Sequence, residues 1–317
     1  MLNRRILRIK AFKVLYSYAE NPDLTLKEAL RSLETSEEAT RDLYLYMMSV
    51  IPALTQVASN RIEAARGKFN PTQEDLNPNM KFVRNGISAL LEGDPDFQRL
   101  IEKKKLSWAQ QDAFLSELYT RLKSRQYFLD YMASPASSVK EDAALWKCIF
   151  EEEFEDDPSL AAILEDTSIH WADDLAYALG TCIRSLDEAG RLGRWSFPPL
   201  YQSDILLAQG REASSDGEFV RKLLTTAYGR FQEYNSLIAG SVSKWDRDRL
   251  YTTDIVLIAM GLAEAESFPD IPIKVTINEY VEISKYYSTP KSRGFVNGIL
   301  DRLIKQREAE GIIVKNI

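Results

Sequence analysis

Apolar residues recur at helical spacing along almost the whole chain, and this periodicity most constrains the fold. In the first segment five apolar residues fall at i, i+4, i+7, i+8 and i+11, on one face of a helix: Leu7, Ala11, Val14, Leu15 and Tyr18. Asn3 is a suitable N-cap for that helix. Alternating apolar and polar residues, as half-buried strands require, are scarce. We therefore expect an all-α protein.

Further helices are expected along the rest of the chain. One helix begins near Thr25, and a longer helix follows it. Pro52 lies in this longer helix and should kink or interrupt it. Residues 67–79 contain two Asn-Pro pairs and are expected to form a loop, and residues 190–202 form the clearest linker. The remaining helices are expected over 81–92, 95–105, 107–133, 139–154, 159–165, 170–188, 216–240, 246–266, 273–287 and 290–309.

Composition excludes several classes of protein. The 317 residues are 45% hydrophobic, enough for one large core or two modest domains. Cys148 and Cys182 have no partner pattern, so we expect neither a disulfide framework nor a zinc site, and a reducing, cytoplasmic location fits. No stretch approaches 18 uncharged apolar residues, and no apolar segment follows the basic N-terminus. We therefore expect no membrane span and no secretory signal.

Positive charge is concentrated at the start of the first helix, although the chain carries a net charge of -7. Residues 3–16 hold five basic residues and no acidic one: Arg4, Arg5, Arg8, Lys10 and Lys13. Cations in the first turn oppose the helix dipole, whereas a bound phosphate would reverse that effect. The cluster is therefore either a solvated terminus with incidental charge or one side of an anion site.

The C-terminal stretch repeats this arrangement. Thr289 and Pro290 suit the N-cap and first position of a helix, and Lys291 and Arg293 follow at once. Basic residues next to Phe295 suit single-stranded RNA, because bases stack on aromatic rings while cations hold phosphates. Two helical glycines, Gly294 and Gly298, indicate close approach of another backbone, from either a helix or a nucleotide chain.

No catalytic centre is evident. The single histidine, His170, has neither further ligands nor a nucleophile near it in the sequence. The acidic pairs are best explained as solvated helix faces, and the chain lacks a Gly-rich phosphate loop, G-x-S-x-G and C-x-x-C. We expect no enzyme activity, no metal and no cofactor.

Both ends of the chain resemble the NusB family. The N-terminal signature, R-R-x-x-R-x-x-A-x-x-x-L-Y, is met by Arg4, Arg5, Arg8, Ala11, Leu15 and Tyr16. The C-terminal stretch "PIKVTINEYVEISKYYSTPKSRGFVNGILDRL" is similar to P-x-K-V-x-I-N-E-x-x-E-x-x-K followed by S-x-x-F-V-N-G-[VI]-L-D. The resemblance covers about 1–20 and 215–305.

The resemblance implies helical bundles and a transcription antitermination factor that promotes transcription of ribosomal RNA operons. It implies boxA-like single-stranded RNA, the NusE-type small-subunit ribosomal protein and the transcription elongation complex as partners, and it leaves a homodimer open. By position, the RNA contacts fall on Arg4, Arg5, Arg8, Lys13, Tyr16, Lys291, Ser292, Arg293, Phe295 and Arg302.

The chain also departs from the family pattern. Ile9 stands where an acidic residue is common, and Leu257, Gly261 and Leu262 replace an Arg and a Tyr-Glu. Compact family members have about half this length. We therefore expect NusB-like segments at 1–40 and 211–317, and a mostly helical insertion at 41–210.

Alternatives remain at this point. Thr276 and Glu279 have capping-box spacing and Glu282 can pair with Lys285, so we interpret that helix as structural. The alternative to RNA binding is a protein-interaction scaffold with the same fold that has lost RNA binding. An RNA methyltransferase with such a domain is disfavoured, because no α/β half follows the C-terminal segment.

Overall fold

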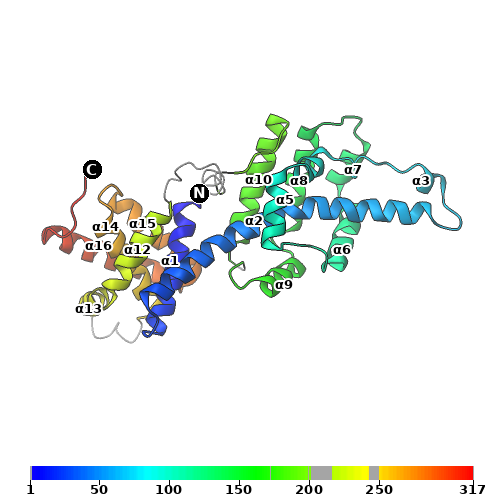
Figure 1. Ribbon diagram of the computed structural model, residues 1–317. Coiled ribbons are helices and arrows are strands. Elements are labelled where there is room, and N and C mark those ends of the chain that lie inside the picture. Colours follow the sequence, from blue (N-terminus) through cyan, green and yellow to red (C-terminus); the bar gives the residue numbers. More distant parts are fainter. Residues whose placement is uncertain (1, 172, 199, 201–215, 243–249, 317) are drawn as a thin grey trace. The chain divides into compact units, whose positions relative to one another are not determined.

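The protein is all helical over the residues that its computed structural model describes, which are 2–171, 173–198, 200, 216–242 and 250–316. Figure 1 shows this helical architecture. The chain divides into two compact units, which we call unit 1 (residues 1–37 and 210–317) and unit 2 (residues 38–209). Among the described residues, no helix combines the length and the apolar character needed to cross a bilayer.

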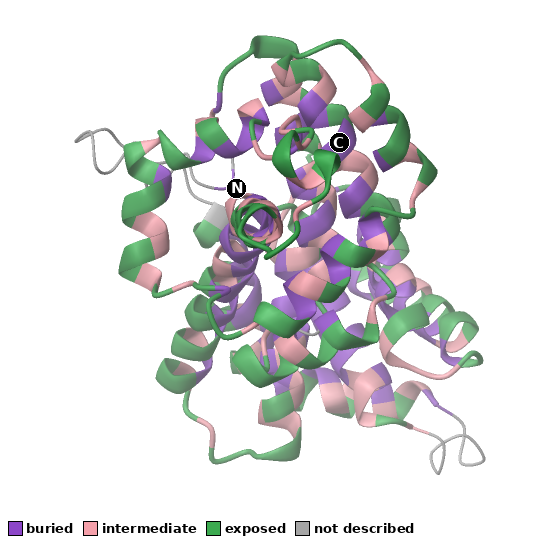
Figure 2. Ribbon diagram, turned by 90° about the vertical axis from the view of Figure 1, so that its right-hand side faces the viewer, coloured by how far each residue is buried: buried purple, intermediate pink, exposed green. Residues whose placement is uncertain are grey.

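Unit 1 is built around one helix that is buried on all sides. This helix is α14 (Thr252–Ser267), in which every residue from Val256 to Ala265 is buried. A helix that is apolar all round belongs at the centre of a bundle. Its neighbours in the bundle are α1 (Arg4–Glu20), α12 (Asp216–Gly229), α13 (Phe231–Ser241), α15 (Ile273–Tyr287) and α16 (Ser292–Ala309). Figure 2 shows that buried (purple) and exposed (green) residues alternate along the helices of the protein, as expected of helices that pack through one face.

The longest helix, α2 (Leu26–Arg66), begins in unit 1 and continues into unit 2. Its start is fixed by a capping box, in which the Glu28 amide donates to Thr25 Oγ1 and the Thr25 amide donates to the Glu28 carboxylate. Two successive helices were expected here, and this was wrong because a single helix spans both. The helix also passes through Pro52, so the expected interruption there was wrong, while the kink stays a prediction. Proline removes one backbone hydrogen bond, and the full burial of Ile51 and Leu54 beside it stabilises the helix.

Unit 2 contains the rest of α2 and eight described helices. They are α3 (Gln73–Leu76), α4 (Gly86–Glu92), α5 (Pro95–Lys104), α6 (Asp112–Leu122), α7 (Gln126–Ala133), α8 (Val139–Glu153), α9 (Pro158–Thr167) and α10 (Leu175–Leu192). Aromatic side chains fill the core: Trp146 and Tyr44 are fully buried, and Tyr46 stacks on Trp108 at 4.2 Å between ring centroids.

Several expected boundaries were wrong. The loop expected over 67–79 contains α3, and the linker expected over 190–202 begins inside α10 and lies partly outside the described residues. The helix expected over 107–133 is two helices, α6 and α7, and the one expected over 216–240 breaks at Arg230 into α12 and α13. At the first break, Arg121 and Arg125 both bind the buried carboxylate of Glu153. Tertiary ion pairing thus overrides local periodicity there. The helix expected over 246–266 corresponds to α14, which begins at Thr252. Residues 246–249 lie outside the described residues.

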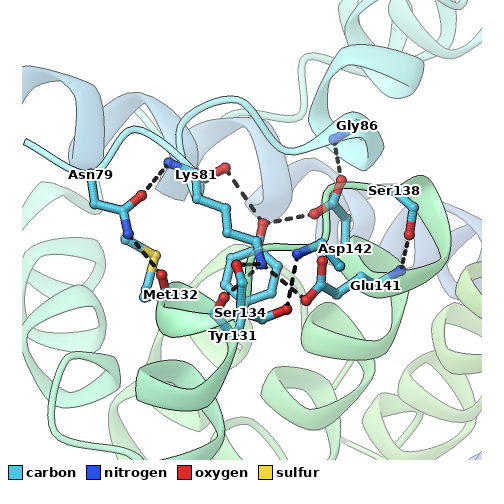
Figure 3. Close-up of polar contacts among 10 residues, drawn as sticks. Asn79, Lys81, Gly86, Tyr131, Met132, Ser134, Ser138, Glu141 and Asp142 are labelled. Atoms are coloured by element: carbon cyan, nitrogen blue, oxygen red, sulfur yellow. Dashed lines mark hydrogen bonds and ion pairs between the residues drawn. The ribbon is translucent and has the colours of Figure 1, made fainter.

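A polar network joins the segment before α4 to α7 and α8 (Figure 3). The Lys81 ammonium donates to the backbone oxygens of Tyr131 and Ser134 and pairs with Glu141 at 3.0 Å. The Tyr131 hydroxyl donates to Asp142 Oδ1 and the Gly86 amide donates to Asp142 Oδ2, both at 2.7 Å. The helix begins at Gly86 and not at residue 81, because the Asn85 side chain caps it by accepting from the Ser88 amide and Asp142 accepts from the Gly86 amide.

Candidate nucleic-acid interface

The three arginines at the start of α1 have different environments. Asn3 caps the helix as expected, since its side chain accepts from the Ile6 amide at 2.9 Å. Arg4 and Arg5 are exposed, whereas Arg8 is only 3% exposed. The spacing of four residues turns Arg4 and Arg8 toward the same side, and both guanidinium groups lie over the ring of Phe219, at 5.1 and 5.4 Å.

Arg8 is held in the bundle by Glu264 of α14. Its Nε and Nη2 donate to Oε2 and Oε1 of this fully buried carboxylate, at 2.7 and 2.9 Å. Thr276 Oγ1 and the Tyr280 hydroxyl also donate to Glu264. Burial alone would lower the pKa of Arg8, but the hydrogen bonds and charge of Glu264 outweigh it and raise that pKa. Arg8 is therefore a structural cation in this conformation.

The capping box expected at Thr276 and Glu279 was wrong. The N-cap of α15 is Pro272, and the Thr276 hydroxyl is directed to Glu264 instead of to its own helix. Because α15 begins at Ile273, Thr276 lies inside the helix and cannot cap its start.

Arg5 is paired at the surface with Glu279 of α15. Its Nε and Nη2 donate to the two carboxylate oxygens at 3.0 and 2.7 Å, while its side chain stays 52% exposed. The hydrogen bonds raise the pKa of Arg5 and lower the pKa of Glu279. Arg4, Arg5 and Arg8 line an open groove of about 380 Å³ beside Pro272 and Val275.

The first turn of α16 carries a second group of the expected residues. The helix begins at Ser292 with Lys291 as its N-cap, so the expected start at Thr289 and Pro290 was two residues early. Ser292 is buried, and its hydroxyl donates to Asp254 Oδ2 at 2.8 Å. Ser288 donates to the other oxygen of Asp254. These hydroxyls satisfy a buried carboxylate of α14 and anchor the helix start.

The other expected residues of α16 lie nearer the surface. Lys291 and Arg293 are exposed and Phe295 is half-buried. Arg302 donates to the backbone oxygen of Ser241 at 2.9 Å, at the end of α13. Gly294 and Gly298 have no atom within 4 Å of a built Cβ, so no helix of unit 1 packs closely on them.

Lys13 and Tyr16 lie on α1 near the end of α15. Lys13 Nζ lies 5.7 Å from the ring centroid of Tyr287, and that ring packs against Phe12 at 5.3 Å. Tyr16 is half-buried, with its ring 6.3 Å from that of Phe12. The neighbouring Tyr286 is 81% exposed, and sequence analysis did not single it out.

Helix α15 packs against α16 and is joined to the start of α1 by the Arg5–Glu279 ion pair. Glu282 of α15 pairs with Lys285 as expected, at 2.6 Å. The pKa of Glu282 is lowered first by the hydrogen bond from Lys285, and then by the charges of Arg293 and Arg5. Glu279, the partner of Arg5, and Glu282 are three residues apart and lie on the same side of α15. Their carboxylates place negative charge next to the cations of this surface.

Charge is divided unevenly between the two units. Unit 1 has 22 Lys and Arg against 20 Asp and Glu, a net charge of +2, while unit 2 has 18 against 27, a net charge of -9. The acidity of the whole chain therefore resides in unit 2. No group of three or more His, Cys, Asp or Glu suited to a metal ion occurs among the described residues.

Comparisons with known proteins bear on this interface. The NusB family model matches residues 197–305. The transcription antitermination protein NusB of Natranaerobius thermophilus is 32% identical over 33% of this chain and 76% of its own length. The NusB protein of Chloroherpeton thalassium is 35% identical over 31% of this chain and 47% of its own length. The NusB protein of Thermodesulfovibrio yellowstonii is 38% identical over 30% of this chain and 64% of its own length.

The chain thus spans about half of the Chloroherpeton protein and about three quarters of the Natranaerobius one. No solved structure matches the chain. The matched range includes α12 to α15 and most of α16, with Glu264, Glu279 and the α16 start within it. The chain belongs to the NusB family.

Proposed function

We propose that this protein is a non-catalytic transcription antitermination factor that binds boxA-like single-stranded RNA. It acts with the NusE-type small-subunit ribosomal protein in the transcription elongation complex, and it promotes transcription of ribosomal RNA operons. The name shared by its relatives supports the antitermination role. The observation that carries RNA binding is that two helix starts of unit 1 carry exposed cations, Arg4 and Arg5 at α1 and Lys291 and Arg293 at α16.

The expected residues take different parts in this proposal. Exposed cations hold phosphates, and half-buried aromatic rings offer faces to bases. Arg4, Arg5, Lys13, Lys291, Arg293 and Arg302 supply charge; Tyr16 and Phe295 supply rings; Arg8 and Ser292 hold the starts of α1 and α16 in place. Both groups of cations lie at the first turn of a helix, where the helix dipole also favours an anion.

The division of charge supports a local RNA site on unit 1. A net charge of -9 on unit 2 gives no general attraction for nucleic acid, whereas unit 1 is slightly basic. The boxA-like segment should therefore bind at the unit 1 face, and its binding should weaken with salt. For a single strand, the logarithm of the binding constant falls by about 0.7 per phosphate contact for each tenfold rise in salt.

The test is binding to a boxA-like RNA of about 12 nucleotides and to a scrambled RNA, at two salt concentrations, with and without the NusE-type protein. Arg4→Ala/Arg5→Ala and Lys291→Ala/Arg293→Ala should each weaken binding. The matched control is Lys27→Ala/Arg31→Ala, which removes two exposed cations from α2 in unit 1. Arg8 is left intact because its loss would disturb the fold.

A second candidate function, the scaffold without RNA binding, is favoured by the ion pairs at this face. Arg5 and Arg8 already have carboxylate partners. A folded protein that captures the NusE-type protein but binds no RNA, at either salt concentration and with or without that partner, would support the scaffold and overturn the RNA proposal.

A further inference from the structure

Unit 2 contains an open groove between α8 and α10, with a volume of about 710 Å³. The two helices approach closely at its floor, since a Cβ built on Gly190 would lie 2.9 Å from Ala143 Cβ. Ala144 adds a second small residue to the floor. This volume lies within the range of ligand-binding sites, roughly 300–1,000 Å³.

Four cations and two carboxylates line the groove. The cations are Lys140 and Lys147 of α8 and Arg184 and Arg191 of α10; the carboxylates are Asp187 and Glu188. Their formal sum is +2, in a unit whose net charge is -9. The basic character is therefore local, as it is at the start of α1.

Only part of this positive charge is neutralised by partners within the protein. Lys147 pairs with Asp187 at 2.5 Å, while Arg191 and Glu188 are 3.9 Å apart at the surface. Arg184 donates to the Thr181 hydroxyl, a neutral acceptor. Among the described residues, neither Lys140 nor Arg184 has a carboxylate within ion-pair distance. Lys140 also lies in the first turn of α8, where a cation opposes the helix dipole.

We infer that this groove binds the phosphate backbone of single-stranded RNA. Lys140, Arg184 and Arg191 contact phosphates, and the small residues of the floor let the strand lie close to both helices. An open groove suits a chain that continues beyond it at both ends. The inference rests on the proposed function, because it takes RNA as the polyanion, but it assigns a separate contact to the insertion.

The experiment compares two RNAs on the full-length protein: the boxA-like RNA of about 12 nucleotides, and one of about 30 nucleotides with the same segment at its centre. The groove variant is Lys140→Gln/Arg184→Gln/Arg191→Gln. The control variant, Arg84→Gln/Lys103→Gln/Lys123→Gln, removes three exposed cations of unit 2 that do not line the groove. Circular dichroism verifies that both variants are folded.

The wild type should bind the long RNA more tightly than the short one. The groove variant should lose about tenfold or more on the long RNA only, and its salt slope there should fall by about 2, for three lost phosphate contacts. The control variant should retain both affinities. Arg4→Ala/Arg5→Ala should weaken both RNAs.

Two results would overturn the inference while leaving the unit 1 site intact. One is a groove variant that binds the long RNA as the wild type does. The other is saturation of the groove by a free nucleoside triphosphate, measured by calorimetry, with no effect of RNA length. A folded wild type that binds neither RNA would overturn both the groove and the proposed function.

Discussion

Arg8 and Glu264 form a bidentate ion pair inside unit 1, with nitrogen–oxygen distances of 2.7 and 2.9 Å. The pair joins α1 to α14, which are far apart in the sequence. It also shows that the basic start of α1 has two roles: Arg8 stabilises the bundle, and Arg4 and Arg5 remain at the surface. A basic run in a sequence therefore does not identify a binding surface residue by residue.

Arg8→Ala should destabilise unit 1 severely. It leaves the Glu264 carboxylate buried with only hydroxyl donors, and loss of one partner of a buried pair costs about 3–5 kcal/mol. Chemical denaturation measures the free energy of unfolding. Lys27→Ala, an exposed control in the same unit, should change it by less than about 0.5 kcal/mol. Equal effects of the two substitutions would contradict a structural role for Arg8.

Glu279→Gln should strengthen RNA binding. The carboxylate holds both donors of Arg5 that a phosphate would use, so its neutralisation frees the guanidinium and removes a repelling charge. An exposed pair contributes about 0.2–1 kcal/mol, so the gain should be about 1.4- to fivefold. Glu20→Gln is the control of equal charge, on an exposed residue. Weaker binding by Glu279→Gln would mean that the carboxylate positions Arg5 instead of competing for it.

Glu233 should make unit 1 sensitive to acid. Hydrogen bonds from Arg230 and Arg307 lower its pKa to about 2. Because the folded pKa lies below the unfolded value of about 4.3, the stabilisation is present above pH 4.3 and is lost as pH falls toward 2. The difference in unfolding free energy between wild type and Glu233→Gln should shrink over that interval. A difference that stays constant from pH 5 to pH 2 would contradict this linkage.

Tyr131→Phe should destabilise unit 2 by about 1–3 kcal/mol. It removes the donor to Asp142 Oδ1 and leaves a buried acceptor without that hydrogen bond. Tyr286→Phe serves as the control, because that side chain is 81% exposed. Thermal or chemical unfolding measures the stability of both variants. Similar stabilities would contradict this prediction and would indicate that water replaces the lost donor.

Sequence patterns predicted the helices better than the site. Periodicity and the cap at Asn3 located α1, and the helix start expected near Thr25 agrees with α2, because those signals are local. Glu264 and Asp254 were missed, because nothing in an apolar helix shows that Arg8 and Ser292 will reach their carboxylates. Pairings such as Arg5 with Glu279 depend on the bundle and not on spacing.

Two glycines should respond in opposite directions to a single added methyl group. Gly298 of α16 has open space at its Cβ position, so Gly298→Ala should stabilise unit 1 by about 0.5–1 kcal/mol through helix propensity. A Cβ on Gly261 of α14 would lie 2.6 Å from Leu300 Cδ2, so Gly261→Ala should destabilise it by about 1–3 kcal/mol. Chemical denaturation measures both. If an RNA backbone lies against Gly298, the stabilised Gly298→Ala protein should bind boxA-like RNA more weakly; unchanged affinity would place the strand elsewhere on this face.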